Sequence, residues 1–233
     1  MLSSDESHHL TRVLRLVTGD AVEVFDGKGH EFAGRVARAD RFAAKIALVA
    51  ALPGVPEPAV PTVVVQAVLK GDKMDGVIRD ATMAGVAVIV PIVTARSLVN
   101  IPALRRAHAL ERWQRIAIAS AKQCRRSRLP EIELARPFDD WLSAPFDGPR
   151  LLMVEPSAGR DGAVPMRQVL EVPPPPAVAC VVGPEGGWTD LERDAAARAG
   201  CIATSLGPMT FRADAVALVA ASILTFAFEP PSA

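Results

Sequence analysis

The sequence predicts an α/β protein in which a mostly parallel sheet follows a small N-terminal β-barrel domain. Residues 1–51 hold short strand-like runs with tight turns, as small barrels do. Four prolines and a glycine over 52–61 resist both helix and inner strand. From residue 62 onward, apolar runs alternate with helical segments, which is typical of a parallel sheet covered by helices. We therefore assign a barrel to 1–51, a linker to 52–61 and an α/β domain to 62–233.

The N-terminal part should begin with a short helix over 9–16. Helical spacing would place Leu10, Val13 and Leu14 on one face of this helix. Three strands are expected next, with an Asp-Gly turn after the first. They cover 21–25, 30–37 and 43–50.

In the C-terminal part, continuous apolar runs predict strands that are covered on both faces. These strands are expected over 62–69, 86–93, 151–154 and 178–182. Helices are expected over 74–81, as one long helix from Pro102 to Cys124, near 166–170, and over 213–228. The last segment contains Asp214 and is shorter than the ~20 residues that a membrane span needs, so it predicts a buried helix and no membrane association.

The composition is that of a globular protein without general affinity for polyanions. The formal net charge is zero, so any contact with nucleic acid must come from a local basic patch. Three scattered cysteines predict neither a disulfide framework nor a zinc site, and Cys180 and Cys201 are expected to be core residues. The adjacent His8 and His9 have no nearby third ligand, so no metal site is expected. The polar first residues predict no signal peptide and a cytoplasmic location.

Two loops rich in Gly and Pro each follow a strand signal and precede a helix. In the first, GPEGG, glycines allow close approach of a ligand to the backbone, and Thr189 with Glu192 predicts a capping box. A helix N-terminus beside this loop could hold an anion. An ordinary strand-to-helix connection remains an alternative. Because the loops follow neighbouring strands of an α/β sheet, they predict one composite ligand pocket.

The second loop, LGPMTFR, ends at Arg212, just before an apolar helix. Asp214 in the first turn of that helix is consistent with the helix macrodipole alone, and Arg212 with simple solvation. A basic cluster lies further upstream, at residues 122–128. It could hold a phosphate backbone or could simply be a solvated helix end.

Taken in order, these motifs resemble the ribosomal RNA small subunit methyltransferase E family of the SPOUT superfamily. The resemblance extends from HLTRVLRL and GDAVEVFDGKG through LKGDKMD, ATMAGV and AKQCRRSRLPEI to GPEGG and LGPMTFRADAVAL. It implies a PUA-like barrel followed by an α/β trefoil knot, and a homodimer with the active site at the subunit interface. It also implies S-adenosylmethionine as cofactor and N3 of a uridine in the 16S rRNA of the small ribosomal subunit as the methylated atom.

The resemblance further implies roles for particular residues. Arg212 would stabilise negative charge on the uridine, and Asp214 would act as a base or orient the uridine. The implied cofactor contacts are Val182, Gly183, Pro184, Glu185, Gly186, Gly187, Leu206, Gly207, Pro208, Thr210 and Phe211. The implied RNA contacts are Lys70, Lys73, Arg96, Lys122, Arg125, Arg126 and Arg128.

The chain departs from the family pattern in the second loop and at other places along the sequence. Where the family usually reads LRxETA, this chain has Phe211, Asp214 and Ala215; where it reads Glu-Leu-Gly, this chain has Met83-Ala84-Gly85. The usual acidic residue before Arg96 is absent, and the barrel is expected to lack its first strand. These changes favour a second hypothesis, a divergent relative that binds cofactor and RNA but modifies another site or is inactive. A third hypothesis is an enzyme that binds a phosphate ligand through the glycine loop. The sequence contains no nucleophile elbow and no paired catalytic carboxylates to support it.

Overall fold

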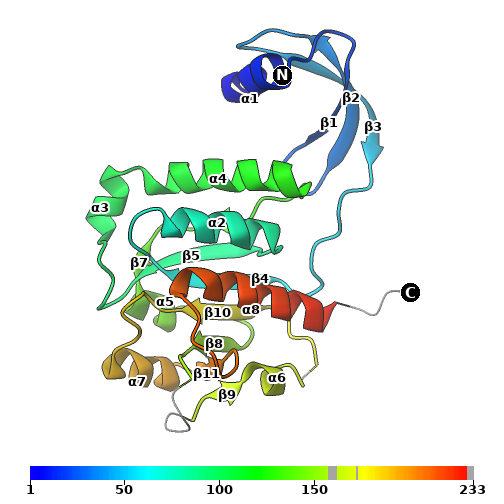
Figure 1. Ribbon diagram of the computed structural model, residues 1–233. Helices are drawn as coiled ribbons and strands as arrows, with labels where there is room; N and C mark the ends of the chain where they lie inside the picture. Colours follow the sequence, from blue (N-terminus) through cyan, green and yellow to red (C-terminus); the bar gives the residue numbers. More distant parts are fainter. Residues whose placement is uncertain (157–161, 172, 230–233) are drawn as a thin grey trace. The chain divides into compact units, whose positions relative to one another are not determined.

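The structure is a computed structural model that describes residues 1–156, 162–171 and 173–229 (Figure 1). The chain forms two compact units, which divide after Pro56 within the Pro-rich stretch. The N-terminal unit contains Met1–Pro56 together with Arg125–Leu129, and the second unit contains Glu57–Cys124 and Pro130–Ala233.

The N-terminal unit is built on an antiparallel sheet with β2 in the middle. Its elements are α1 (Ser4–His8), the π-helical turn η1 (His9–Val13), β1 (Ala21–Phe25), β2 (Glu31–Arg38) and β3 (Lys45–Leu52). All three strands lie close to their predicted positions. In the described residues, β1 and β3 each pair with β2 but not with each other, so the sheet is open between them.

A second chain segment completes this unit. Arg125 adopts a left-handed conformation (φ 61°) just after α4, and the following residues run beside the turn after β1. The Gly29 N–H donates to the Ser127 carbonyl at 3.1 Å, and the Leu129 N–H donates to the Gly27 carbonyl at 3.0 Å. The N-terminal unit is therefore made from two stretches that lie far apart in the sequence.

The N-terminal helix begins earlier than predicted, because Ser3 caps it by accepting a hydrogen bond from the Glu6 N–H at 3.2 Å. Leu10 is buried as expected. Val13 and Leu14, predicted on the same face, are instead 61% and 54% exposed, since the turn that carries them is π-helical and shifts their positions.

The second unit contains a parallel sheet. Its strands, in the residues described, are β4 (Thr62–Ala67), β5 (Val88–Val93), β6 (Glu131–Ile132), β7 (Arg136–Pro137), β8 (Arg150–Met153), β9 (Val164–Pro165), β10 (Val178–Val182) and β11 (Ile202–Ser205). The order is β6-β5-β4-β10-β8-β11-β9, with β7 also on β5. All the observed pairs are parallel, as predicted.

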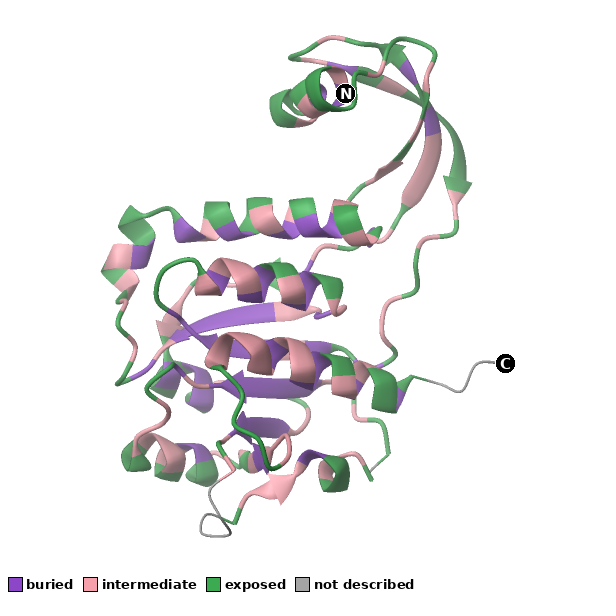
Figure 2. Ribbon diagram, in the orientation of Figure 1, coloured by how far each residue is buried: buried purple, intermediate pink, exposed green. Residues whose placement is uncertain are grey.

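Helices cover both faces of this sheet. They are α2 (Lys73–Met83), α3 (Ile101–Arg106), α4 (Ala109–Cys124), α5 (Phe138–Ser143), α6 (Met166–Val169), α7 (Asp190–Arg198) and α8 (Ala213–Phe228). Side chains alternate across each strand, so Val64 packs in a core with α2, α4 and α8, and Val65 packs in a core with α5 and α7. Figure 2 shows that the strands between these layers are mostly buried.

The single long helix predicted from Pro102 is wrong, because the chain breaks into α3 and α4. His108 lies between them in a left-handed conformation (φ 47°). The predicted helices α2 and α8 are confirmed. Cys180 is confirmed as a core residue: it is fully buried in β10, and this burial raises the pKa of its thiol to about 12, so it is not a nucleophile.

Arg150 is a buried cation that joins β8 to the end of α5. Its guanidinium donates to the carbonyl oxygens of Leu142 (2.9 Å) and Ala144 and lies 5.0 Å from the centre of the Trp141 ring. A cation is favourable at this position because the last carbonyls of a helix carry partial negative charge. The side chain therefore satisfies backbone groups that would otherwise remain unpaired.

Replacing Arg150 with Met should lower the free energy of unfolding by about 2–3 kcal/mol, because two carbonyl groups lose a charged donor. Urea denaturation followed by tryptophan fluorescence would measure the change. As a control, Arg79→Met removes an exposed pair with Asp80 and should change stability by less than about 0.5 kcal/mol. Equal stability of the two variants would contradict the structural role given to Arg150.

Candidate active site

Both Gly/Pro loops line a single pocket of about 520 Å³ in the second unit. It lies beyond the ends of β10, β8 and β11, at the edge where parallel strands of α/β proteins commonly bind ligands. The predicted cofactor residues line this pocket, except Gly207 and Pro208. Residues that the sequence did not single out also line it, among them Met153, Glu155, Trp188 and Arg193. The composite pocket is therefore confirmed.

Two glycines of GPEGG lie close to neighbouring side chains. A Cβ on Gly183 would lie 3.0 Å from the Trp188 ring, and a Cβ on Gly186 would lie 3.3 Å from the Arg96 side chain. The sequence suggested that glycine leaves room for a ligand. At these two positions it leaves room for Trp188 and Arg96, which come close to the loop backbone.

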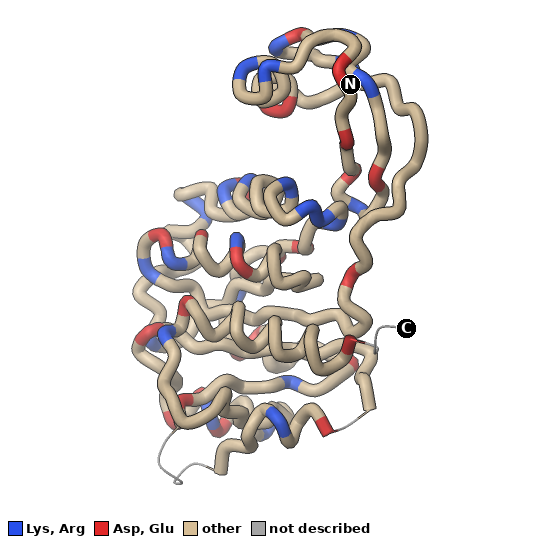
Figure 3. Tube along the Cα trace, turned by 45° about the vertical axis from the view of Figure 1, so that its right-hand side comes forward, with Lys and Arg blue, Asp and Glu red and all other residues tan. Residues whose placement is uncertain are grey.

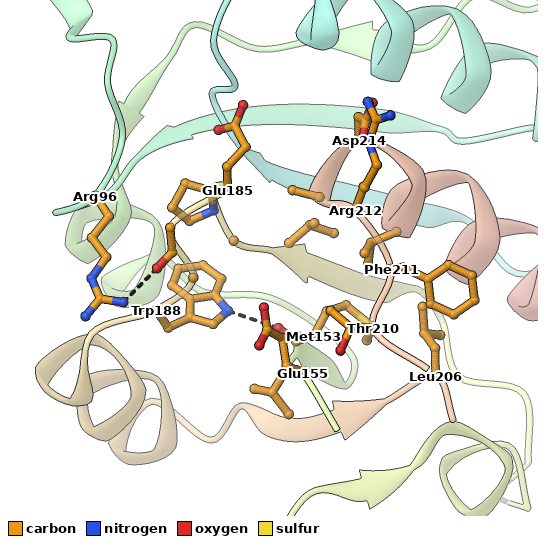
Figure 4. Close-up of a pocket in the computed structure, with 18 of the residues that line it drawn as sticks. Arg96, Met153, Glu155, Glu185, Trp188, Leu206, Thr210, Phe211, Arg212 and Asp214 are labelled. Carbon is orange, nitrogen blue, oxygen red and sulfur yellow. Dashed lines mark hydrogen bonds and ion pairs between the residues drawn. The ribbon is translucent and has the colours of Figure 1, made fainter. Parts of the chain in front are cut away.

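Trp188 forms one wall of the pocket (Figure 4). Its indole N–H donates to the Met153 carbonyl at 3.0 Å, and its ring lies 4.8 Å from that of Phe138. The hydrogen bond joins the GPEGG loop to the end of β8. A partly buried aromatic ring with a satisfied N–H is a rigid surface, suited to a planar ligand group.

The GPEGG loop is also anchored to the loop after β5. The guanidinium of Arg96 donates to the Gly186 carbonyl at 2.6 Å (Figure 4). The Ala95 N–H donates to Glu192 Oε1 at 2.8 Å, while Oε2 of the same carboxylate accepts from the Thr189 N–H at 2.9 Å. The predicted capping box is thus confirmed. Because the Glu192 carboxylate already lies at the N-terminus of α7, that helix end does not offer the anion site suggested from the sequence.

A further contact holds the loop on the side of α2. Lys73 Nζ lies 2.9 Å from Glu185 Oε1, and the Lys70 N–H donates to the same oxygen at 3.4 Å. Partial burial raises the pKa of Glu185. The hydrogen bonds from Lys73 and from backbone N–H groups lower it by a larger amount, so the pKa of Glu185 lies below its ordinary value. Both side chains are about one-third exposed, so the pair stabilises the loop by only about 0.5 kcal/mol.

Arg212 and Asp214 form a two-point ion pair where α8 begins. Arg212 Nε lies 3.1 Å from Oδ1 of Asp214, and Nη2 lies 2.5 Å from Oδ2. The Arg212 side chain is 75% exposed and lines the pocket. Figure 4 shows both side chains together, away from Trp188 and Glu155. Since both carboxylate oxygens of Asp214 accept from Arg212, the carboxylate holds the guanidinium in place.

Glu155 is a pocket residue that sequence reasoning missed. It follows β8 directly and is exposed. Its carboxylate has no hydrogen-bond partner within the described part of the chain, whereas Glu185 and Asp214 are paired with basic groups. No motif marks Glu155, but its place after an apolar strand end next to the other pocket loops is a usable signal.

The predicted RNA contacts separate into two groups. Lys73 and Arg96 contact the GPEGG loop, as described above, and line the pocket. In the basic cluster, positive positions continue from α4 into the segment that follows (Figure 3). Arg125 and Arg128 are exposed there, but Arg126 is only 6% exposed. The Arg126 side chain is therefore less accessible to an RNA phosphate than those of Arg125 and Arg128.

Two other features bear on the kind of site. No group of three His, Cys, Asp or Glu side chains close enough to bind a metal occurs among the described residues. In the same residues, no helix has the length and apolarity needed to cross a bilayer.

Comparisons with known proteins agree with this fold and site. A family model described as an RNA methyltransferase domain matches residues 56–225, and one described as an RNA methyltransferase PUA domain matches residues 2–48. The ribosomal RNA small subunit methyltransferase E of Mycobacterium bovis is 33% identical over 234 residues, covering 97% of this chain and 86% of that protein.

Two solved structures are similar over nearly the whole chain. One is a ribosomal RNA small subunit methyltransferase E from Neisseria gonorrhoeae bound to S-adenosyl methionine, with 26% identity, a TM-score of 0.84 and coverage of 97% of this chain and 90% of that one. The other, from Legionella pneumophila, was solved with bound SAM and has 27% identity, a TM-score of 0.87 and the same coverage.

The parallel sheet, its pocket and the two matching domains define an RNA methyltransferase of the SPOUT class with a PUA domain. Within that class, the chain belongs to the ribosomal RNA small subunit methyltransferase E family. The resemblance noted in the sequence is thereby confirmed.

Replacing Arg96 with Ala should weaken binding of S-adenosylmethionine, the cofactor that the family resemblance implies, about tenfold. The GPEGG loop loses a charged hydrogen bond worth about 1.5 kcal/mol. Isothermal titration calorimetry measures the affinity, and Arg105→Ala, at an exposed position on α3, is the matched control. If Arg96→Ala weakened RNA binding alone, Arg96 would belong to the RNA surface instead.

Proposed function

We propose that this protein transfers a methyl group from S-adenosylmethionine to N3 of a uridine in the 16S rRNA of the small ribosomal subunit. The observation that carries the proposal is the pocket formed by the two Gly/Pro loops, with Arg212 at its margin. The family membership and the cofactor bound in similar structures support it.

The pocket suits this cofactor in size and chemistry. About 520 Å³ lies within the range of pockets that hold small molecules. Trp188, Phe211 and Leu206 provide apolar surface for adenine and the methionine chain, and loop backbone groups provide polar contacts. The Glu155 carboxylate, which has no partner among the described residues, is suited to hydroxyl or ammonium donors of the ligand. When bound, S-adenosylmethionine supplies an electrophilic methyl group.

Arg212 is the residue best placed to assist the acceptor. Uridine N3 becomes a nucleophile once its proton has passed to solvent, and negative charge then spreads over the neighbouring carbonyl oxygens. A planar, permanently charged guanidinium stabilises such charge. Asp214 holds that guanidinium through two contacts, which makes it a positioning residue. This role replaces the suggestion that Asp214 is the base.

We propose that the N-terminal unit binds the RNA. Arg125 and Arg128 are exposed and suited to phosphate contacts. Phe42 is 61% exposed with the Arg41 guanidinium 4.3 Å from its ring centre, a combination that stacks on unpaired bases. Lys122, at the end of α4 in the second unit, would add a further phosphate contact.

The assembly and location belong to the same proposal. The family resemblance implies a homodimer, a trefoil knot in the second unit and work in the cytoplasm, where ribosomal RNA is found. The position of β10 between β4 and β8, out of chain order, is consistent with a knotted connection. Size-exclusion chromatography with light scattering would test the dimer.

A second candidate is a divergent family member that binds cofactor and RNA but modifies another site or is inactive. It is favoured by Asp214 and Ala215, which replace the usual glutamate and threonine. Binding of S-adenosylmethionine without methyl transfer to small subunits would support this candidate.

The proposed reaction predicts that 16S rRNA from a strain lacking this gene loses one N3-methyluridine. Mass spectrometry of digested rRNA measures the nucleoside, and expression of the wild-type chain should restore it. Unchanged N3-methyluridine in the deletion strain would refute the assignment.

Replacing Arg212 with Ala should lower kcat about 10²–10³-fold, as loss of an oxyanion-stabilising donor does, with little change in cofactor affinity. Asp214→Asn keeps the shape of the side chain but weakens its interaction with the Arg212 guanidinium, so we expect a smaller decrease in kcat, about tenfold. Single-turnover methyl transfer to small subunits measures both. If Asp214→Asn were as inactive as Arg212→Ala and lost the acid limb of its pH profile, Asp214 would be the base.

A further inference from the structure

A second hollow, of about 480 Å³, adjoins the cofactor pocket and shares Lys73, Arg212 and Asp214 with it. The rest of its lining comes from residues 75–80 of α2, from Asp72 just before α2, and from Ile116 of α4. We infer that this hollow receives the base of the RNA nucleotide that accepts the methyl group. The inference rests on the proposed function and assigns a place to its second substrate.

The position of the hollow fits this role. Methyl transfer requires the acceptor atom about 3–3.5 Å from the methyl carbon, so the acceptor must lie directly beside the cofactor. Arg212 stands on the boundary between the two spaces, with its side chain 75% exposed. A guanidinium held there by Asp214 faces the space where charge on an acceptor base would develop.

Gly76 provides independent support. It lies inside α2, where glycine costs about 0.5–1 kcal/mol relative to alanine. Its φ is not in the left-handed region, and a Cβ would meet only the end of the Arg79 side chain, at 3.8 Å. Neither packing nor backbone conformation therefore requires glycine. The space above Gly76 belongs to the hollow, and Ile116 offers an apolar surface there for the face of a base.

The charges around the hollow favour a base over a phosphate. Four aspartates and three basic residues line it, so the lining carries a net formal charge of −1 and offers no excess positive charge to a phosphate. Three of them are paired, namely Asp75 with Arg112 at 2.8 Å, Asp80 with Arg79 at 2.8 Å, and Asp214 with Arg212. The Asp72 carboxylate does not cap α2 and has no partner among the described residues. It is available to accept a hydrogen bond from a donor group of the bound nucleotide.

The test places a side chain in the hollow by substituting Gly76. Gly76→Ala should raise Tm by about 2–4 °C, because the helix accepts a Cβ at this position without strain. Gly76→Leu should lower kcat/KM for small subunits at least 30-fold, with an S-adenosylmethionine Kd within twofold of the wild type. Asp72→Asn should lower kcat/KM about tenfold. Met83→Phe, an exposed position of α2 outside the hollow, is the matched control and should be fully active.

The outcomes separate this inference from the proposed function. An inactive wild-type chain would refute the proposed function itself. An active wild type with a fully active Gly76→Leu variant would overturn only the placement of the base. A Gly76→Leu variant that lost activity by becoming monomeric, measured by light scattering, would show that the hollow receives a second copy of the chain, and would also overturn it.

Discussion

The parallel pairing of β10 with β4 on one side and β8 on the other is the constraint on which the site depends. It aligns Cys180 with Val64 and with Leu151, so these strands end at the same edge. Because β11 also pairs with β8, the loop after β11 arrives beside the loop after β10. Two segments about two dozen residues apart thus form one pocket. Packing of β10 between two hydrophobic cores keeps that edge fixed.

On this rigid edge, the loops are held mainly by hydrogen bonds between side chains and backbone. Arg96 and Glu192 tie the GPEGG loop to the loop after β5, and Trp188 ties it to the end of β8. The second loop has Arg212 held by Asp214. An aspartate, shorter by one methylene than the usual glutamate, still reaches two guanidinium nitrogens here. The departure from the family pattern therefore leaves a positioned arginine at the pocket margin.

The parts of the structure that depend on local pattern could be predicted from the sequence. Apolar runs revealed four strands of the sheet, β4, β5, β8 and β10, and Thr189 with Glu192 revealed the cap of α7. The features that the sequence did not predict depend on contacts or backbone conformations of the folded chain. No local sequence pattern at Arg96 predicted its hydrogen bond to Gly186, ninety residues away. The break at His108 depends on one left-handed residue, and histidine carries no strong preference for it.

The N-terminal unit is discontinuous in sequence, which has a consequence for synthesis and for dissection of the protein. Residues 125–129 hydrogen-bond to the turn at Gly27 and Gly29, yet the ribosome makes them about seventy residues after the sheet ends. The last contacts of the N-terminal sheet can therefore form only after α4 has left the ribosome. No single cleavage separates the two units, since the chain passes between them three times. Their folding is therefore coupled through the connectivity of the chain.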